Sequence, residues 1–81
     1  MKYFVTGATG FIGNNIVREL LKEKDAEVIA LARNKNDVSL QGLDIKIVQG
    51  DITDVELMDR IVEEGMVIIH VAGIVALESK L

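Results

Sequence analysis

Three glycines at three-residue spacing constrain this chain more than any other feature. They lie within the run Val5–Gly13, between a short apolar segment and a longer amphipathic one. Glycine leaves room for a bulky anion such as a diphosphate to approach the backbone, and a following helix offers unpaired N–H groups and the positive end of its dipole. The run therefore predicts a strand–turn–helix that cradles a diphosphate. A tight turn without a ligand is the alternative.

The rest of the chain alternates strand-like and helix-like segments without a hairpin signal between them. This alternation predicts parallel strands joined by crossovers, hence a doubly wound α/β half-domain with four parallel strands in the order 3-2-1-4 and two principal helices. We expect strands at Tyr3–Thr6, Glu27–Ala32, Ile45–Gly50 and Met66–Val71, helices at Phe11–Lys24 and from a capping box at Thr53 to about Glu64 with Gly65 as the C′ residue, and a loop with room for one helical turn at Asn34–Gly42.

Composition excludes several classes of function. The 81 residues include no cysteine and one histidine, and the net charge is −4. We therefore expect no disulfide, no metal site and no nucleic-acid partner. We expect no membrane segment, because the longest apolar stretch is far shorter than the ~20 residues of a membrane span. A cytoplasmic location follows, or a peroxisomal one only if Ser79-Lys80-Leu81 is a natural C-terminus.

Three motifs in order resemble the extended short-chain dehydrogenase/reductase family, which includes NAD-dependent epimerases, dehydratases and dihydroflavonol-reductase-like enzymes. They are Gly-Ala-Thr-Gly-Phe-Ile-Gly from Gly7, Gly-Asp-Ile from Gly50, and His-Val-Ala-Gly from His70. The resemblance implies that residues 1–81 form the N-terminal part of an NAD(P)-binding Rossmann domain. The parent protein would be an oxidoreductase or epimerase that moves a hydride at nicotinamide C4.

The same resemblance implies roles for individual residues. The glycine motif corresponds to Gly7, Gly10 and Gly13. The backbone of Thr9, Phe11 and Ile12 would face the pyrophosphate. Asp51 and Ile52 would flank the adenine ring, with the carboxylate accepting from the exocyclic amine, and Ala72 and Gly73 would lie under the adenine ribose and central phosphates.

The end of the second strand bears on the choice of cofactor. An acid about 20 residues beyond the last glycine would bond the ribose 2′-hydroxyl of NAD, but that position holds Arg33. A guanidinium suits a 2′-phosphate, so we predict NADP, with NAD as the alternative. Arg33 as a solvated loop cation, Asp51 as a turn cap and His70 as a hydrogen-bonded core histidine remain open.

The catalytic pair of the resembled family is missing from these residues. That family uses a Tyr-x-x-x-Lys pair, with tyrosine as general acid/base. Tyr3 is the only tyrosine, and Gly7 stands where the lysine would be needed. We therefore predict no catalytic residue and no turnover by this chain alone.

The strand Met66–Val71 is expected to leave an unprotected apolar edge. We predict self-association through this strand or by exchange of the tail after Gly73. Two classes of function stay open: the N-terminal cofactor-binding part of an epimerase, dehydratase or reductase, or a non-catalytic or designed Rossmann half whose main property is folding and self-assembly.

Overall fold

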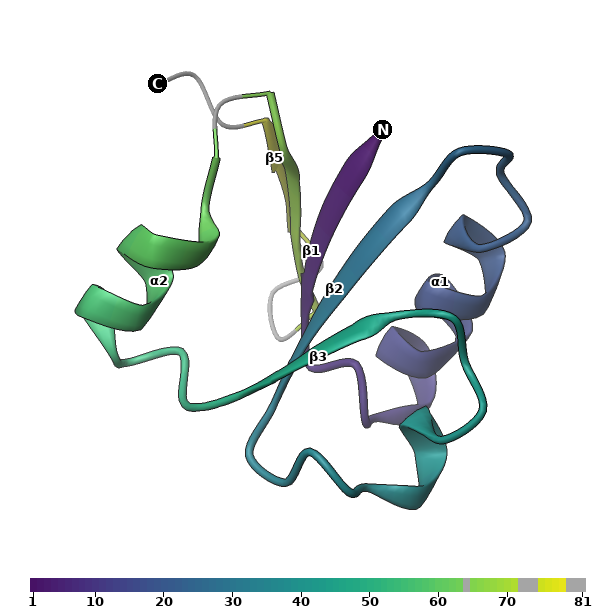
Figure 1. Ribbon diagram of the computed structural model, residues 1–81, viewed down its shortest axis with the longest axis horizontal. Coiled ribbons are helices and arrows are strands. Elements are labelled where there is room, and N and C mark those ends of the chain that lie inside the picture. Colours follow the sequence, from purple (N-terminus) through teal and green to yellow (C-terminus); the bar gives the residue numbers. More distant parts are fainter. Residues whose placement is uncertain (64, 72–74, 79–81) are drawn as a thin grey trace.

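A five-stranded sheet forms the centre of the molecule (Figure 1). The computed structural model describes residues 1–63, 65–71 and 75–78. Its strand order is β3-β2-β1-β4-β5. The first four strands are parallel, and β5 runs antiparallel to β4. The predicted order 3-2-1-4 is thus confirmed. The strands are β1 (Lys2–Thr6), β2 (Glu27–Ala32), β3 (Lys46–Gln49), β4 (Val67–His70) and β5 (Val75–Glu78).

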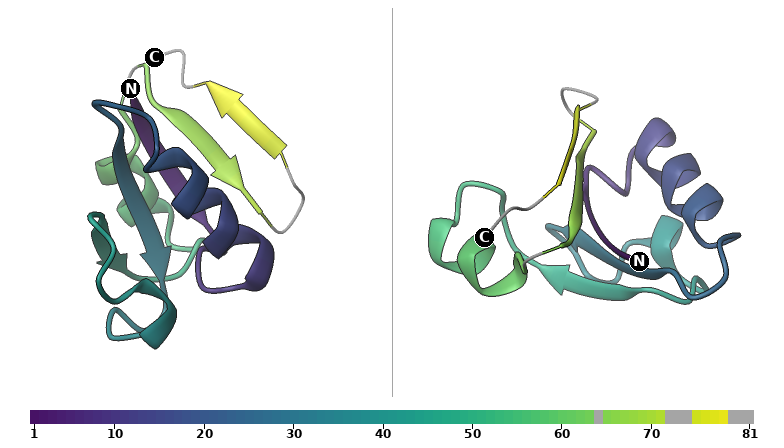
Figure 2. Two further views of the ribbon diagram at one scale, coloured as in Figure 1. Left: turned by 90° about the vertical axis from the view of Figure 1, so that its right-hand side faces the viewer. Right: turned by 90° about the horizontal axis from the view of Figure 1, so that it is seen from above.

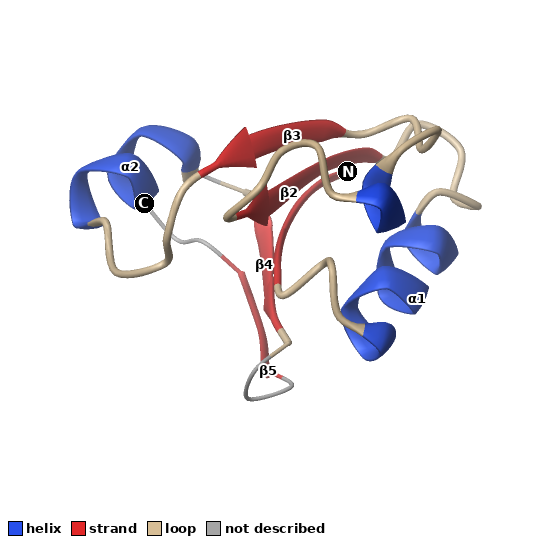
Figure 3. Ribbon diagram, turned by 90° about the horizontal axis from the view of Figure 1, so that it is seen from below, coloured by secondary structure: helices blue, strands red, loops and turns tan. Residues whose placement is uncertain are grey.

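Helices cover both faces of the sheet (Figures 2 and 3). Helix α1 (Phe11–Leu20) and the short 3₁₀ helix η1 (Val38–Leu40) lie on one face, and helix α2 (Val55–Ile61) lies on the other. On the α1 face, Val17 and Leu40 are buried in a cluster with the inward side chains of β1 and β2. On the α2 face the buried cluster is Phe4, Leu31 and Met66. No α2 residue is fully buried, so this helix covers its face less completely than α1.

The helices are shorter than predicted. Helix α1 ends at Leu20 rather than Lys24, and the chain then reverses through Asp25, which has a left-handed φ of 69°. Helix α2 is capped by Asp54 rather than Thr53, because the Asp54 side chain accepts the Leu57 N–H. It ends at Ile61, so Gly65, although its φ is 81°, is not the residue that ends the helix. The amphipathic pattern of the sequence continues beyond the last residue of each helix, so the pattern does not show where α1 and α2 end.

Strand β5 was not predicted. The residues after Gly73 were expected to form a short tail, but Val75–Glu78 pairs with β4 in the register Val67↔Glu78 to His70↔Val75. The expectation that Met66–Val71 leaves an unprotected edge is therefore wrong. The chain satisfies that edge itself, and β3 and β5 become the outer strands of the sheet.

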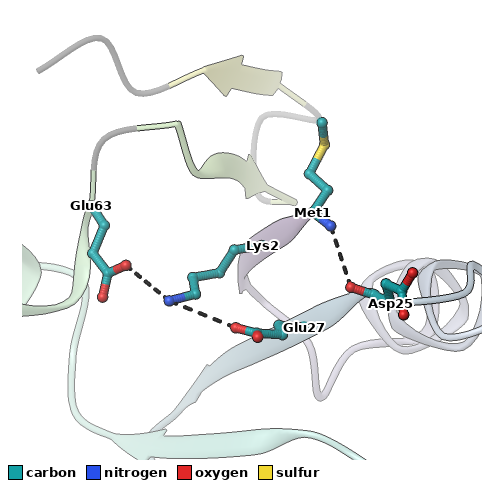
Figure 4. A network of polar contacts seen from close by, with 5 residues as sticks. All are labelled: Met1, Lys2, Asp25, Glu27 and Glu63. Atoms are coloured by element: carbon teal, nitrogen blue, oxygen red, sulfur yellow. Dashed lines mark hydrogen bonds and ion pairs between the residues drawn. The ribbon is translucent and has the colours of Figure 1, made fainter.

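Charged groups at the amino end of the sheet pair with one another (Figure 4). The Lys2 ammonium lies 2.9 Å from Glu63 and 3.6 Å from Glu27. The hydrogen bond from Lys2 to Glu63 is the main cause that raises the pKa of Lys2. The N-terminal ammonium also donates to the Asp25 carbonyl at 3.3 Å. These contacts tie β1 to β2 and to the segment that follows α2.

Within the described ranges, neither α-helix has the length and apolar character needed to cross a bilayer.

Candidate functional site

A pocket of about 320 Å³ opens at the carboxyl ends of β1, β2, β3 and β4. In open parallel sheets this is the edge at which ligands bind. Residues from four separate segments line the pocket: Thr6, Gly7, Thr9, Leu31, Ala32, Arg33, Asn34, Asp37, Gly50, Asp51, Ile52 and His70.

The structure brings together some of the predicted cofactor residues and leaves others outside the pocket. Those that line it are Gly7, Thr9, Arg33, Asp51 and Ile52. Four others belong to the start of α1 and are not part of the lining: Gly10, Phe11, Ile12 and Gly13. Ala72 and Gly73 lie outside the described residues. The binding roles of these eleven residues remain predictions, and five of the eleven line one cavity.

The first and third glycines are required by the fold itself. Gly7 has a φ of 72°, and a Cβ there would lie 3.1 Å from the Cβ of Val71. A Cβ on Gly13 would overlap the Gly7 carbonyl group, whose carbon would be 2.7 Å away. These two residues let α1 approach the turn after β1, whether or not a ligand is present.

The second glycine is not required by the packing. Among the described residues, a Cβ on Gly10 would meet only the Gly7 carbonyl oxygen, at an ordinary distance of 3.6 Å. Gly10 is the N-cap of α1, with a φ of −76° that other residues also adopt, and it has no side chain to cap the helix. The first-turn N–H groups of α1 have no acceptor within the helix, and none of them donates a hydrogen bond to another described residue.

Arg33 and Asp51 face each other across the ends of β2 and β3. The Arg33 guanidinium lies 3.5 Å from the Asp51 carboxylate, and its side chain is 87% exposed. The other carboxylate oxygen accepts from both the N–H and the hydroxyl of Thr53, each at 3.0 Å. The backbone hydrogen bond from Thr53 is the main cause that lowers the pKa of Asp51, with the hydroxyl next and Arg33 adding a smaller effect. Asp51 therefore caps a turn and also faces the pocket.

Sequence reasoning assigned no binding role to several lining residues. Thr6 and His70 end adjacent strands in register, and the Thr6 hydroxyl lies 2.6 Å from His70 Nδ1. This hydrogen bond favours the interpretation of His70 as a satisfied, partly buried histidine. The five others with no assigned role are Leu31, Ala32, Asn34, Asp37 and Gly50. Four of them lie at or just after the ends of β2 and β3, which was the available signal, whereas Asp37 lies further along the loop after β2.

In the part of the chain that the structure describes, no three His, Asp or Glu side chains are placed to hold a metal ion together.

The strand order, the glycine turn and the position of the pocket define a Rossmann-like α/β domain. Residues 3–80 match the model of the NAD-dependent epimerase/dehydratase family. The chain belongs to this family.

Individual relatives agree with this assignment. Over 79 residues, covering 90% of this chain, it is 37% identical to a dTDP-glucose 4,6-dehydratase of Mycobacterium tuberculosis, 24% of whose length is matched. A UDP-glucuronic acid 4-epimerase of Bacillus cereus, solved with NAD, superposes with a TM-score of 0.64 at 25% identity, over 86% of this chain and 26% of that one. The oxidoreductase ylbE of Lactococcus lactis has a TM-score of 0.65 at 32% identity, over 88% and 32%. The chain spans about a quarter of the length of the curated relatives it matches.

Proposed function

We propose that residues 1–81 bind the ADP half of a nicotinamide dinucleotide. The observation that carries this proposal is the pocket at the strand ends, where the glycine turn after β1 and the charged pair after β2 and β3 share one cavity. The first-turn N–H groups of α1 would bind the diphosphate, and Asp51 with Ile52 would hold the adenine.

The residues present fit this ligand. A Cβ on Gly10 would partly fill the space beside this residue, although the packing of the described residues would tolerate it. Beside it, the N–H groups of the first turn of α1 donate to no other described residue, and a diphosphate oxygen would accept hydrogen bonds from them. When bound, the dinucleotide would supply hydride chemistry at its nicotinamide ring, while this chain supplies binding and orientation.

The predicted preference for NADP rests on Arg33. An arginine at the end of β2 attracts a 2′-phosphate, but this guanidinium is exposed and already lies beside Asp51. Exposed ion pairs of this kind contribute about 1 kcal/mol or less. We propose that Arg33 gives NADPH a modestly higher affinity than NADH, and that NADH remains the alternative ligand. The Bacillus cereus relative was solved with NAD.

Calorimetric titration of the purified chain with NADPH, NADH and ADP tests the proposal. We expect all three to bind, with Gly10→Ala weakening each, because each carries the diphosphate. Arg33→Ala should weaken NADPH more than NADH. Binding of neither dinucleotide by the folded chain would refute the function, and equal loss for both cofactors in Arg33→Ala would refute the NADP preference.

We propose that this cradle serves hydride transfer in an epimerase, dehydratase or reductase. The Tyr-x-x-x-Lys pair of such enzymes is not among these residues. We therefore expect no turnover of a sugar nucleotide or ketone by residues 1–81 with either cofactor. Substrate-dependent oxidation of NADPH or NADH by the purified chain, followed at 340 nm, would contradict this expectation.

Self-association by exchange of the tail is a second proposal, favoured by the pairing of β5 with β4. The same register, Val67↔Glu78 to His70↔Val75, can form between two copies if the tail of one crosses to the other. Pairing directly through β4 would first require β5 to leave. Sedimentation velocity at micromolar concentration should show a dimer, and a monomer at every concentration would refute the proposal.

A further inference from the structure

The position of the adenine ribose follows from the strand order, if the proposed function holds. The diphosphate would lie at the end of β1 and the adenine at the end of β3. Strand β2 lies between these two strands. The ribose that links adenine to diphosphate therefore lies over the end of β2, and the residues that follow this strand face its hydroxyl edge. Two charged residues of that segment line the pocket, Arg33 and Asp37.

The segment after β2 holds Asp37 in a defined position. Asp37 N–H donates to the Asn34 carbonyl at 3.1 Å. The Asp37 oxygen Oδ1 accepts from the N–H and the hydroxyl of Ser39, at 2.9 and 2.6 Å. The Ser39 carbonyl in turn accepts from the Asn14 side chain of α1 at 2.8 Å. The carboxylate is thus held within the loop by Ser39, and Ser39 links that loop to the first helix.

Asp37 keeps a charge and a free acceptor at the pocket. The hydroxyl of Ser39, and then its backbone N–H, lower the pKa of Asp37, so the carboxylate is ionised at neutral pH. None of the hydrogen bonds found among the described residues uses its second oxygen, Oδ2. A carboxylate with one anchored and one free oxygen suits a ribose hydroxyl, which can donate to it, and repels a phosphate.

The charges that line the pocket favour the same outcome. Arg33 supplies one positive charge, whereas Asp37 and Asp51 supply two negative ones. Arg33 lies beside Asp51, whereas Asp37 takes part in none of the ion pairs that the described residues form. We propose that Asp37 is a specificity residue that accepts a hydrogen bond from the ribose 2′-hydroxyl and disfavours a 2′-phosphate, opposing Arg33.

The variant Asp37→Asn tests this inference, because an asparagine retains an oxygen for Ser39 but removes the charge. Calorimetry on the full chain should show the ratio of NADPH to NADH affinity rising by about five- to tenfold, an energy near 1 kcal/mol that corresponds to one charge acting across partly solvated space. The increase should shrink at high salt. Ser39→Ala is the matched control: it removes one hydrogen bond to Asp37, keeps the charge, and should leave the ratio within about twofold.

Asp37→Ser, which also caps η1, serves as a second neutral variant if the asparagine variant melts early. An unchanged ratio in the neutral variants, or an equal change for both cofactors, would overturn the role of Asp37 while leaving the proposed function intact. Binding of neither cofactor by the wild-type chain would instead remove the proposed function, and this inference with it.

Discussion

Gly10→Ala and Gly13→Ala should separate the demands of the ligand from those of the fold. At Gly10 a methyl group has 3.6 Å to its nearest neighbour. Replacing glycine by alanine at an N-cap lowers the free energy of unfolding by roughly 0.5–1 kcal/mol. The lower conformational entropy of the unfolded chain with alanine raises it again by about 0.4–1 kcal/mol. The free energy of unfolding should therefore change by less than about 1 kcal/mol. The added methyl group lies where a diphosphate would approach, so we expect dinucleotide affinity to fall at least tenfold, about 1.4 kcal/mol.

At Gly13 the same methyl group overlaps the Gly7 carbonyl. Helix α1 would have to move away from the turn, and overpacking of this kind costs about 1–3 kcal/mol. For a chain of this size, 2 kcal/mol lowers the melting temperature by roughly 8–16 °C.

Thermal melts followed by circular dichroism, together with calorimetric titration of NADPH, measure both quantities on the same samples. If Gly10→Ala melted as early as Gly13→Ala, the packing analysis would be wrong. If it melted normally and still bound NADPH like the wild type, the diphosphate would not approach at Gly10.

Three further outcomes are expected. Leu40→Ala removes a side chain that is 1% exposed and should destabilise the fold by about 2–4 kcal/mol in urea melts; a loss below about 1 kcal/mol would mean that η1 does not pack in the core. Thr53→Ala removes the hydroxyl that donates to Asp51 but keeps the backbone N–H, which is the larger cause of the lowered pKa. The pKa of Asp51 should therefore rise part of the way toward its ordinary value in a carbon-13 titration, and the stability that this carboxylate adds above its unfolded pKa should be lost at a higher pH as acid is added. An unmoved pKa would show that the Thr53 hydroxyl does not lower it. Tyr3 donates to Glu23 at 2.7 Å, and this hydrogen bond is the main cause that raises the pKa of Tyr3. The stability that this hydrogen bond adds is present below the pKa of Tyr3 in the unfolded chain and is lost as the pH rises through its pKa in the folded chain. Tyr3→Phe should therefore abolish this loss of stability at alkaline pH. If the variant and the wild type lose stability identically at alkaline pH, Tyr3 is not the group responsible.

The sheet was predictable because β1, β2 and β4 are short apolar runs, and no hairpin signal separates any of the four parallel strands, including the more polar β3. Val5, Ala30 and Ile69 occupy paired positions on β1, β2 and β4, and each lies in such a run. Strand β5 was not predictable from Val75–Glu78 alone, since four residues become a strand only when a neighbouring edge is free to pair. The start of α2 was missed because Asp54 and Thr53 are both able to cap a helix, and hydrophobic periodicity does not show which of their side chains forms the capping hydrogen bond.

The candidate site was predictable where a residue ends a strand. Arg33 directly follows β2 and Asp51 lies two residues after the end of β3, so parallel pairing brings them to one edge. Asp37 lies further along the loop, and its position depends on hydrogen bonds to Asn34 and Ser39. Because hydropathy does not reveal hydrogen bonds of this kind, the sequence indicated only that Asp37 belongs to a polar loop.

The two ends of the sheet differ in how their charges are used, and this difference supports a ligand at the carboxyl end. At the amino end Lys2 donates a hydrogen bond to Glu63 and also lies near Glu27, so the chain satisfies these groups itself. At the carboxyl end, among the described residues, Arg33 makes only a longer ion pair, at 3.5 Å, and one oxygen of Asp37 takes part in no hydrogen bond. Helix α1 adds a first turn whose cap residue has no side chain. A dinucleotide would form hydrogen bonds with donors and acceptors that have no partner among the described residues at this edge of the sheet. Mutations at the opposite, amino end, such as Lys2→Met, should therefore alter stability without changing the affinity for NADPH.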